Sequence, residues 1–228
     1  VGLFRCSYPN NPYQCYGTTR HNHWAGYHVH WQRSRHSNNN QKNIIMENRI
    51  KKVAVLGAGT MGAQIAGHFS NAGISALLFD INSELAKKGV EALTKLRPAP
   101  LYKPKNAELI TACTYDTDLE KLKDVDLVIE AVAENLDIKH TVYKNIIPHL
   151  KDSVIMSSNT SGIPLEDLIK VLPDSLKSRF LITHFFNPPR YMRLLELVKG
   201  PKTDKSVYET LSLLGQNILG KGIVHAKD

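Results

Sequence analysis

The stretch that decides the fold is KKVAVLGAGTMGAQIAGHFSNAGISALLFD, residues 51–80. It opens with an apolar run, residues 53–56, that has no polar alternation, as expected of a parallel strand buried on both faces. Three glycines follow in G-x-G-x-x-G spacing: Gly57, Gly59 and Gly62. Apolar residues then recur at helical intervals, and a second apolar run ends at Asp80. The stretch predicts a strand, a glycine turn, a helix and a second strand.

This order of elements predicts a dinucleotide site. Gly57 permits the tight turn, Gly59 lets the backbone approach a pyrophosphate, and Gly62 lets helix and strand pack closely. The helix start at Thr60 and Met61 directs free N–H groups and the positive end of the helix dipole toward the phosphates.

Asp80 indicates which dinucleotide is bound. A carboxylate at the end of the second strand is placed to accept hydrogen bonds from the adenosine ribose hydroxyls. It would repel the 2′-phosphate of NADP, so NAD is favoured. A lone glycine pattern is a weak signal, but here the strand, the helix and the acid coincide.

Composition narrows the function classes. The chain has 228 residues, 42% of them hydrophobic, and a net charge of +8. Residues 1–46 hold five basic and no acidic residues, which leaves +3 for the remainder and argues against nucleic-acid binding. No apolar run approaches the roughly 20 residues that span a bilayer. Three cysteines offer no disulfide framework and fit a reducing compartment: Cys6, Cys15 and Cys113.

The leader, residues 1–46, differs in kind from the rest of the chain, and three interpretations stay open. Cysteines and histidines could bind a metal, although their spacing matches no usual zinc pattern: Cys6, Cys15, His21, His23, His28 and His30. The absence of acids resembles a mitochondrial transit peptide, but no amphipathic helix is present. The third interpretation is a disordered or non-native extension, with Met46 as the natural start. We adopt this one, with a nucleotide-binding domain over residues 47–228.

Strand and helix patterns alternate through the rest of the chain. They predict an α/β fold with a doubly wound, mainly parallel sheet of Rossmann type. Further strands are expected at residues 110–115, 126–132, 154–156, 180–186, 194–198 and 222–225, and helices at 84–96, 136–150, 164–171 and 204–219. Ligands of such sheets lie at the carboxyl ends of the strands.

Several local features follow from the pattern. Ser83 is predicted to cap the helix over 84–96, with an apolar face of Leu85, Val90 and Leu93. The helix after Asn135 is predicted to bury Ile138, Val142, Ile146 and Leu150. Residues 157–162 are predicted to form a polar loop. Glu130 falls inside a buried strand, where a carboxylate needs a partner.

Five motifs in order carry a resemblance to a known family. They are GAGTMG, AVAEN at residues 131–135, SNTS at 158–161, HFFNP at 184–188, and Glu196. Together they resemble the NAD-binding domain of the 3-hydroxyacyl-CoA dehydrogenases of fatty-acid β-oxidation. The resemblance covers about residues 50–228 and is greatest to bacterial bifunctional enzymes that also contain an enoyl-CoA hydratase.

The resemblance implies roles for individual residues. His184 would be the general base that takes the hydroxyl proton of the substrate, and Glu196 would orient its imidazole ring. Ser161 and Asn187 would hold substrate and cofactor at the reacting centre. Because its neighbours are apolar, we expect Glu196 to be buried. Ser161 could instead cap the helix near Pro164.

Two further positions match cofactor contacts in the family. Glu134 and Lys139 would contact NAD, and Asp80 would be the ribose acid. Lys139 is the least specific of these, since a lysine on a helix usually belongs to a solvated face. No metal site is implied.

The resemblance also implies partners. The substrate would be an acyl-CoA, with a fused or associated enoyl-CoA hydratase and a homodimer in the full-length protein. The family's C-terminal helical domain, which forms the other wall of the substrate cleft, is expected to be absent from this chain. The expected compartment is the bacterial cytoplasm, with the mitochondrial matrix as alternative. Two other functions stay open: a non-catalytic NAD-binding protein, and another β-hydroxyacid or sugar-nucleotide dehydrogenase.

Overall fold

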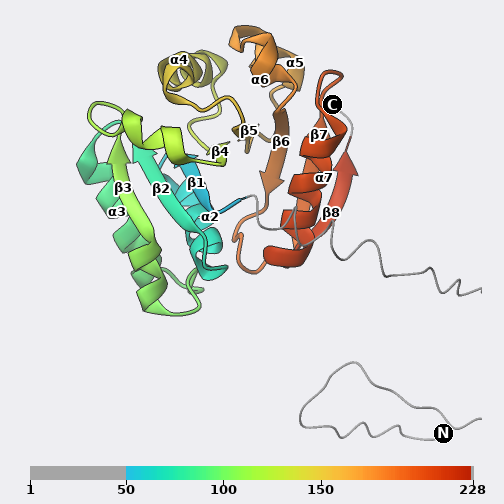
Figure 1. The fold of residues 1–228 in the computed structure, drawn as a ribbon. Helices are drawn as coiled ribbons and strands as arrows, with labels where there is room; N and C mark the ends of the chain where they lie inside the picture. Colours follow the sequence, from blue (N-terminus) through green and yellow to red (C-terminus); the bar gives the residue numbers. More distant parts are fainter. Residues whose placement is uncertain (1–49, 227–228) are drawn as a thin grey trace, which may run out of the picture. The chain divides into compact units, whose positions relative to one another are not determined.

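A single eight-stranded sheet forms the centre of the described part of the chain (Figure 1). The structure, a computed structural model, describes residues 50–226, so the predictions made for the leader lie outside it. The strands are β1 (Lys52–Leu56), β2 (Ser75–Asp80), β3 (Ile110–Thr114), β4 (Leu127–Glu130), β5 (Ile155–Ser158), β6 (Phe180–Phe185), β7 (Leu194–Lys199) and β8 (Gly222–Ala226).

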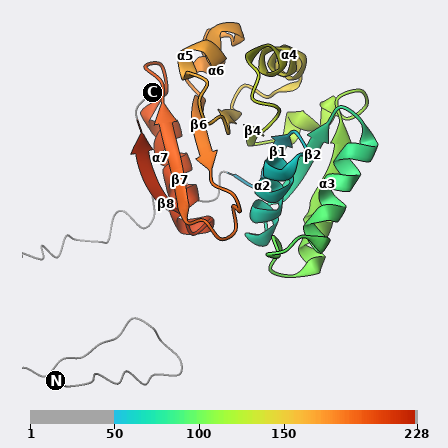
Figure 2. The same cartoon turned by 180° about the vertical axis from the view of Figure 1, so that it is seen from behind.

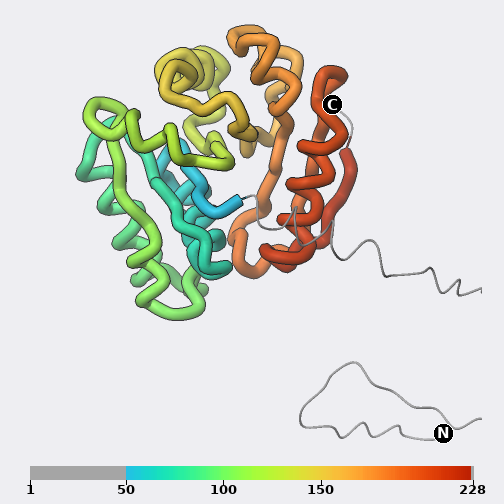
Figure 3. Tube along the Cα trace, viewed as in Figure 1, coloured from blue at the N-terminus to red at the C-terminus, as the bar shows by residue number. Residues whose placement is uncertain are grey.

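The strand order confirms the predicted fold class. The order is β3-β2-β1-β4-β5-β6-β7-β8, and the first six strands are parallel. Figure 3 follows the chain from β1 outward to the β3 edge and then, through β4, to the opposite edge at β8. The direction of winding therefore reverses between β1 and β4, which is the ligand-binding switch point of doubly wound sheets.

Helices connect the strands and cover both faces. The α-helices are α2 (Thr60–Asn71), α3 (Ser83–Lys95), α4 (Leu136–Ile146), α5 (Leu165–Leu168), α6 (Asp174–Lys177) and α7 (Lys205–Leu213). Short 3₁₀ segments lie at Pro104–Leu109, Leu119–Asp124, Ile147–His149 and Ile169–Val171, and α7 ends in a π-turn over Leu214–Ile218. Figure 2 shows α2 and α3 side by side. Within residues 50–226, no helix is both long and apolar enough to cross a membrane.

Alternation along β1 explains why the run without polar residues forms a central strand. Val53 and Val55 pack into the apolar cluster that includes residues of α2, α3 and α7. Ala54 and Leu56 point to the other face and pack into the cluster that includes residues of α4 and α5. Because both faces are covered, every residue at 53–56 is fully buried.

The last two strands, β7 and β8, run against the other six. β7 pairs antiparallel with β6, and it places Glu196 directly opposite His184. β8 then pairs parallel with β7. The predicted "mainly parallel" sheet is confirmed, and its antiparallel pair lies at the position of the predicted catalytic residues.

Two predictions about α3 are wrong. The cap of α3 is Asn82, whose side chain accepts from Leu85 N (2.9 Å), and not Ser83. Leu85 is exposed, whereas the small residues Ala86 and Gly89 face inward. A Cβ on Gly89 would come 2.8 Å from a backbone oxygen, so α3 packs through glycine and alanine at this point.

The buried face of α4 also differs from the prediction. Ile138 is exposed, and the buried residues of the helix are Lys139, Tyr143 and Ile146. Their spacing is still helical, but the pattern was not visible because a lysine and a tyrosine occupy two of its positions. The predicted helix over 204–219 ends earlier as α-helix, at Leu213.

Candidate active site

The glycine turn joins β1 to α2 at the centre of the sheet. Gly57 has φ of +101°, in the left-handed region that favours glycine. A Cβ on Gly62 would lie 1.8 Å from the Gly57 carbonyl oxygen, so α2 can approach the turn only with glycine there. A Cβ on Gly59 would meet no atom within 4 Å, so that side of the turn is open. This geometry fits a pyrophosphate lying against the turn.

The start of α2 presents backbone donors at the same turn. The helix begins at Thr60, directly after Gly59, and its first turn holds no acidic residue. The first N–H groups of a helix have no intrahelical acceptor and carry the positive end of its dipole. The N–H groups around Thr60 and Met61 are therefore suited to an anionic group.

Asp80 braces the glycine turn from β2. Its Oδ2 accepts from Ala58 N at 2.7 Å, and its Oδ1 accepts from Ile81 N at 2.7 Å. The carboxylate is half-buried beside the turn. Its predicted contact with a ribose stays a prediction, because the structure shows only these backbone partners.

The segment after β4 lies against the turn. β4 pairs with β1, and a Cβ on Gly57 would come 2.7 Å from the Ala131 carbonyl oxygen. The structure thus brings the AVAEN segment, residues 131–135, to the switch point of the sheet. This is where a dinucleotide bridges the two halves of such a fold.

His184 and Glu196 form a hydrogen-bonded pair. His184 Nδ1 lies 2.9 Å from Glu196 Oε2, across the β6–β7 ladder. The side chains are 19% and 32% exposed, so Glu196 is half-buried rather than buried as predicted. The carboxylate fixes the ring orientation and leaves Nε2 toward the loop after β5, where Ser161 Oγ lies at 3.2 Å. This is the base-and-orienter arrangement of a catalytic dyad.

The dyad lines a hollow of about 370 Å³. Its walls come from the loop after β5 and from strands β6, β7 and β8: Thr160, Ser161, Gly162, Ile163, Pro164, Ile182, His184, Glu196, Val198 and Ala226. Polar and apolar groups are both present, and His184 Nε2 is the ring nitrogen that remains for a ligand.

Glu134 holds the loop that carries Ser161. Its Oε1 accepts from the Thr160 hydroxyl (2.5 Å), Ser161 N (2.9 Å) and Gly162 N (3.3 Å). Burial acts to raise the pKa of Glu134, but these hydrogen bonds and Lys139 outweigh it and hold the pKa below its usual range. Glu134 is therefore ionised at neutral pH and fixes the loop by three donors.

Lys139 corrects the expectation of a solvated helix face. Its side chain is 1% exposed, and its ammonium lies 3.1 Å from Glu134 Oε2 and 2.7 Å from Glu130 Oε1. The ammonium of Lys139 thus links Glu130, the buried strand carboxylate whose partner the sequence did not identify, to Glu134, which holds the loop after β5. Whether Lys139 also contacts NAD stays a prediction.

Ser161 does not cap the following helix. Pro164 is the N-cap residue of α5 and makes no side-chain cap bond, whereas the Thr160 hydroxyl accepts from Ile163 N (3.1 Å). The Ser161 hydroxyl is directed at His184. The structure therefore favours a place for Ser161 in the site over a place in the cap.

Two residues that the motifs did not single out join the parts of the site. Gln64, buried on α2, donates to Asn187 Oδ1 (3.3 Å), so the nucleotide helix touches the HFFNP segment. Asn159 Oδ1 accepts from Phe185 N (2.8 Å), which ties the loop after β5 to the end of β6. The available signal for the first was a glutamine among the apolar residues Ala63, Ile65 and Ala66.

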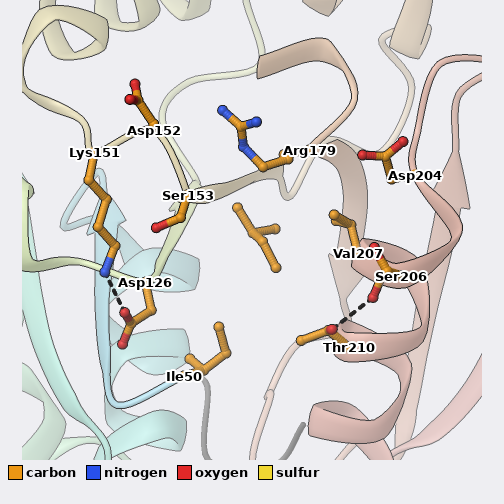
Figure 4. Close-up of a pocket in the computed structure, with 11 residues that line it drawn as sticks. Ile50, Asp126, Lys151, Asp152, Ser153, Arg179, Asp204, Ser206, Val207 and Thr210 are labelled. Atoms are coloured by element: carbon orange, nitrogen blue, oxygen red, sulfur yellow. Dashed lines mark hydrogen bonds and ion pairs between the residues drawn. The ribbon is translucent and has the colours of Figure 1, made fainter. Parts of the chain in front are cut away.

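A larger hollow, of about 450 Å³, lies at the amino ends of the strands, the end of the sheet away from the glycine turn (Figure 4). Its residues precede or begin β1, β4, β5 and β6, or lie at the start of α7, and they include Asp126, which pairs with Lys151. None of the predicted site residues lines it. Among residues 50–226 no group of His, Cys, Asp and Glu side chains is arranged to hold a metal ion.

Comparison with known proteins places this site in a family. A family described as "3-hydroxyacyl-CoA dehydrogenase, NAD binding domain" matches residues 52–228. The chain belongs to this family. NAD is accordingly the cofactor of the domain, and the open glycine turn fits it.

Individual relatives agree. A "Probable 3-hydroxyacyl-CoA dehydrogenase" of Deinococcus radiodurans is 46% identical over 187 residues, 79% of this chain and 54% of that protein. A "Putative fatty acid oxidation complex trifunctional enzyme" of Rickettsia felis is 45% identical over 190 residues, 80% of this chain and 26% of that protein. The chain thus spans between about a quarter and a half of the length of these relatives.

A solved structure shares the fold. The (S)-3-hydroxybutyryl-CoA dehydrogenase of Ralstonia eutropha is 33% identical, with a TM-score of 0.68, over 78% of this chain and 64% of that one.

Proposed function

We propose that this NAD-binding domain serves the oxidation of (S)-3-hydroxyacyl-CoA to 3-oxoacyl-CoA, the reaction of fatty-acid β-oxidation. The observation that carries the proposal is the His184–Glu196 pair, which lines a hollow and directs the second ring nitrogen of His184, Nε2, toward the Ser161 hydroxyl. An alcohol oxidation requires a base at this position, because a proton must leave the hydroxyl as hydride leaves carbon.

The residues of the chain divide the work. His184 Nε2 takes the substrate hydroxyl proton, and the carboxylate of Glu196 stabilises the imidazolium that forms. Ser161, 3.2 Å from the same nitrogen, holds the substrate oxygen in line with the base. NAD, when bound, accepts the hydride. Asn187, in the segment after β6, and Glu134, in the segment after β4, are proposed to position the NAD.

The proposed partners follow from the relatives. The Rickettsia relative is named a trifunctional enzyme, and this favours a longer parent protein with further activities. An acyl-CoA substrate and a fused or associated enoyl-CoA hydratase are proposed on the family resemblance. A homodimer and a bacterial cytoplasmic location are proposed on the same family grounds.

The test follows NADH absorbance with acetoacetyl-CoA, using the 228-residue chain. We expect turnover that falls at least 100-fold in His184→Gln, because general-base catalysis contributes about 10²–10⁴-fold. His140→Gln is the matched control, since His140, on α4, contacts the Asp167 carbonyl of α5 and does not line the hollow. Equal activity of His184→Gln and the unsubstituted chain would remove His184 as the base.

A second candidate is NAD binding without turnover. The observation that favours it is that the residues around the open glycine turn and those that line the hollow at His184 are separate sets, so a dinucleotide can bind whether or not the hollow accepts a substrate. NADH binding detected by fluorescence, with no turnover of acetoacetyl-CoA, would support this candidate. The oxidation would then require a longer parent protein.

A further inference from the structure

Glu130, at the carboxyl end of β4, is a fully buried carboxylate that the proposed reaction does not use. Four donors surround it: Lys139 Nζ (2.7 Å) and Val132 N (2.9 Å) on Oε1, and Ser158 Oγ (2.6 Å) and Tyr143 OH (2.8 Å) on Oε2. These donors come from three separate parts of the chain, the end of β4, α4 and the end of β5. Glu130 therefore joins these elements at one point.

The contacts continue from Glu130 to the dyad. Lys139 bridges Glu130 and Glu134, and Glu134 holds the backbone of Ser161. The loop is also held at its start, because Ser158 bonds Glu130 through its side chain and Asn159 N donates to the Glu130 carbonyl (2.7 Å). A continuous set of contacts thus leads from the buried carboxylate to the hydroxyl that faces His184.

Stability alone is a poor reason for this arrangement. Replacing a buried ion pair by apolar side chains of similar volume is often neutral or stabilising. The charges are better explained by what they position, because ion pairs and charge-assisted hydrogen bonds fix geometry more tightly than apolar contacts.

We propose that Glu130 is a positioning residue, which acts through Lys139 and Glu134 to hold residues 158–162 in the conformation that serves NAD and the dyad. The inference deepens the proposed function and rests on it for the role of Ser161. Its effect on the NAD site is independent of the substrate.

The test separates positioning from stability by a double substitution. Glu130→Gln/Lys139→Met removes both buried charges and keeps both side-chain volumes similar. We expect the double variant to melt closer to the unsubstituted chain than the single variant Lys139→Met does. The NADH dissociation constant of the double variant should nevertheless rise at least tenfold, and any turnover of acetoacetyl-CoA should fall. Recovery of both stability and NADH affinity would overturn the proposal, because the pair would then be only structural.

The matched control is Asp126→Asn/Lys151→Met, the acid–lysine pair at the other end of β4 (Figure 4). We expect NADH affinity to be unchanged in it. An equal loss of affinity in the control would also overturn the proposal, since any disturbed pair on β4 would then suffice.

A milder pair of variants decides the matter if the double variant does not fold. Ser158→Ala removes a donor to Glu130, whereas Ser157→Ala removes a neighbouring buried hydroxyl that bonds Thr183 instead. We expect a three- to tenfold rise in the NADH dissociation constant for Ser158→Ala and none for Ser157→Ala. Equal values would reject the positioning role. Absence of turnover in the unsubstituted chain would reject the proposed reaction alone, because the NADH comparison does not depend on it.

Discussion

The two ends of β4 carry the same chemistry in different surroundings. At the amino end, Asp126 pairs with Lys151 at 2.5 Å, and the side chains are 21% and 32% exposed. At the carboxyl end, Glu130 pairs with Lys139 at 2.7 Å, and the exposed fractions are 0% and 1%. The first pair is surrounded by solvent and backbone donors, whereas the second is enclosed by side chains that lead to the site.

The difference shows that burial decides how strongly an ion pair constrains the structure around it. The Asp126–Lys151 pair is only half-buried, so water can replace either partner at small cost and the pair constrains little. Removal of Lys139 from the buried pair leaves the Glu130 carboxylate with neutral donors only and no opposite charge. The carboxyl end of β4 is therefore the end at which geometry is fixed, and it is the end that leads to the proposed ligand site.

The largest effect is expected for Lys139→Met, which leaves Glu130 buried without a cation. We expect a loss of about 3–5 kcal/mol in the free energy of unfolding, measured by urea denaturation. Lys151→Met at the other end of the strand should cost no more than about 1 kcal/mol. Similar losses of unfolding free energy in the two lysine variants would show that the two ends of β4 do not differ in this way.

A smaller effect is expected for Tyr143→Phe, which removes one neutral donor from Glu130 and keeps every charge. A hydrogen bond to a charged group contributes about 1.5–3 kcal/mol, and we expect a loss in that range. Tyr115→Phe is the matched control. The Tyr115 hydroxyl is buried with no hydrogen-bond partner among the described residues, so its removal should be neutral or stabilising.

Lys221 offers a third case for this comparison, because it is a buried lysine whose hydrogen-bond partners are carbonyl oxygens and not a carboxylate. Its ammonium donates to the backbone of Pro189 and Met192, and burial lowers its pKa to about 8. Above that pH the unfolded chain, with a lysine pKa near 10.4, binds more protons than the folded one. Stability should therefore rise with pH above about 8, by at most about 1.4 kcal/mol per pH unit.

The measurement is urea denaturation between pH 7 and 9, with Lys221→Met as the variant that should lack this rise. The range stops near 9 because burial raises the pKa of Cys113 to about 11, and this acts in the opposite direction at higher pH. The same slope in both proteins would assign the rise to another group.

The smallest effect is expected for Asp126→Asn, about 1 kcal/mol or less at neutral pH. Burial acts to raise the pKa of Asp126, but Lys151 and the N–H groups of Lys51 and Lys52 hold it below its usual range. The ionised carboxylate thus stabilises the fold above about pH 4, and this contribution is lost as the pH falls further. Acid titration of both proteins, followed by circular dichroism, should show a weaker dependence in the variant.

Local patterns in the sequence were sufficient for the parts of the fold that depend on near neighbours. The β1–α2–β2 unit was predictable because apolar runs and glycine spacing are local signals. The pairing of His184 with Glu196 could be predicted only from the family resemblance, because the sequence of one strand alone does not determine its register with the next.

The burial of Lys139 could not be predicted for a different reason. Its partners lie in β4 and in the segment after it, and only the packing of α4 on the sheet brings them together. A lysine at a helical position has the same appearance whether its partner is water or a buried carboxylate. Asn82 and Ser83 show a similar limit, because both are good capping residues and one position separates them.

The antiparallel pairing of β6 with β7 has a consequence for how the chain can vary in length. His184 and Glu196 share one face because they are directly opposite in the ladder. One residue inserted within β7 ahead of Glu196 would turn its carboxylate to the opposite face of the sheet and separate the pair. Two inserted residues would restore the face but shift the carboxylate along the strand. Insertions in the connection between the strands, residues 186–193, leave the ladder in register, so length variation is compatible with the dyad there and not within the strands.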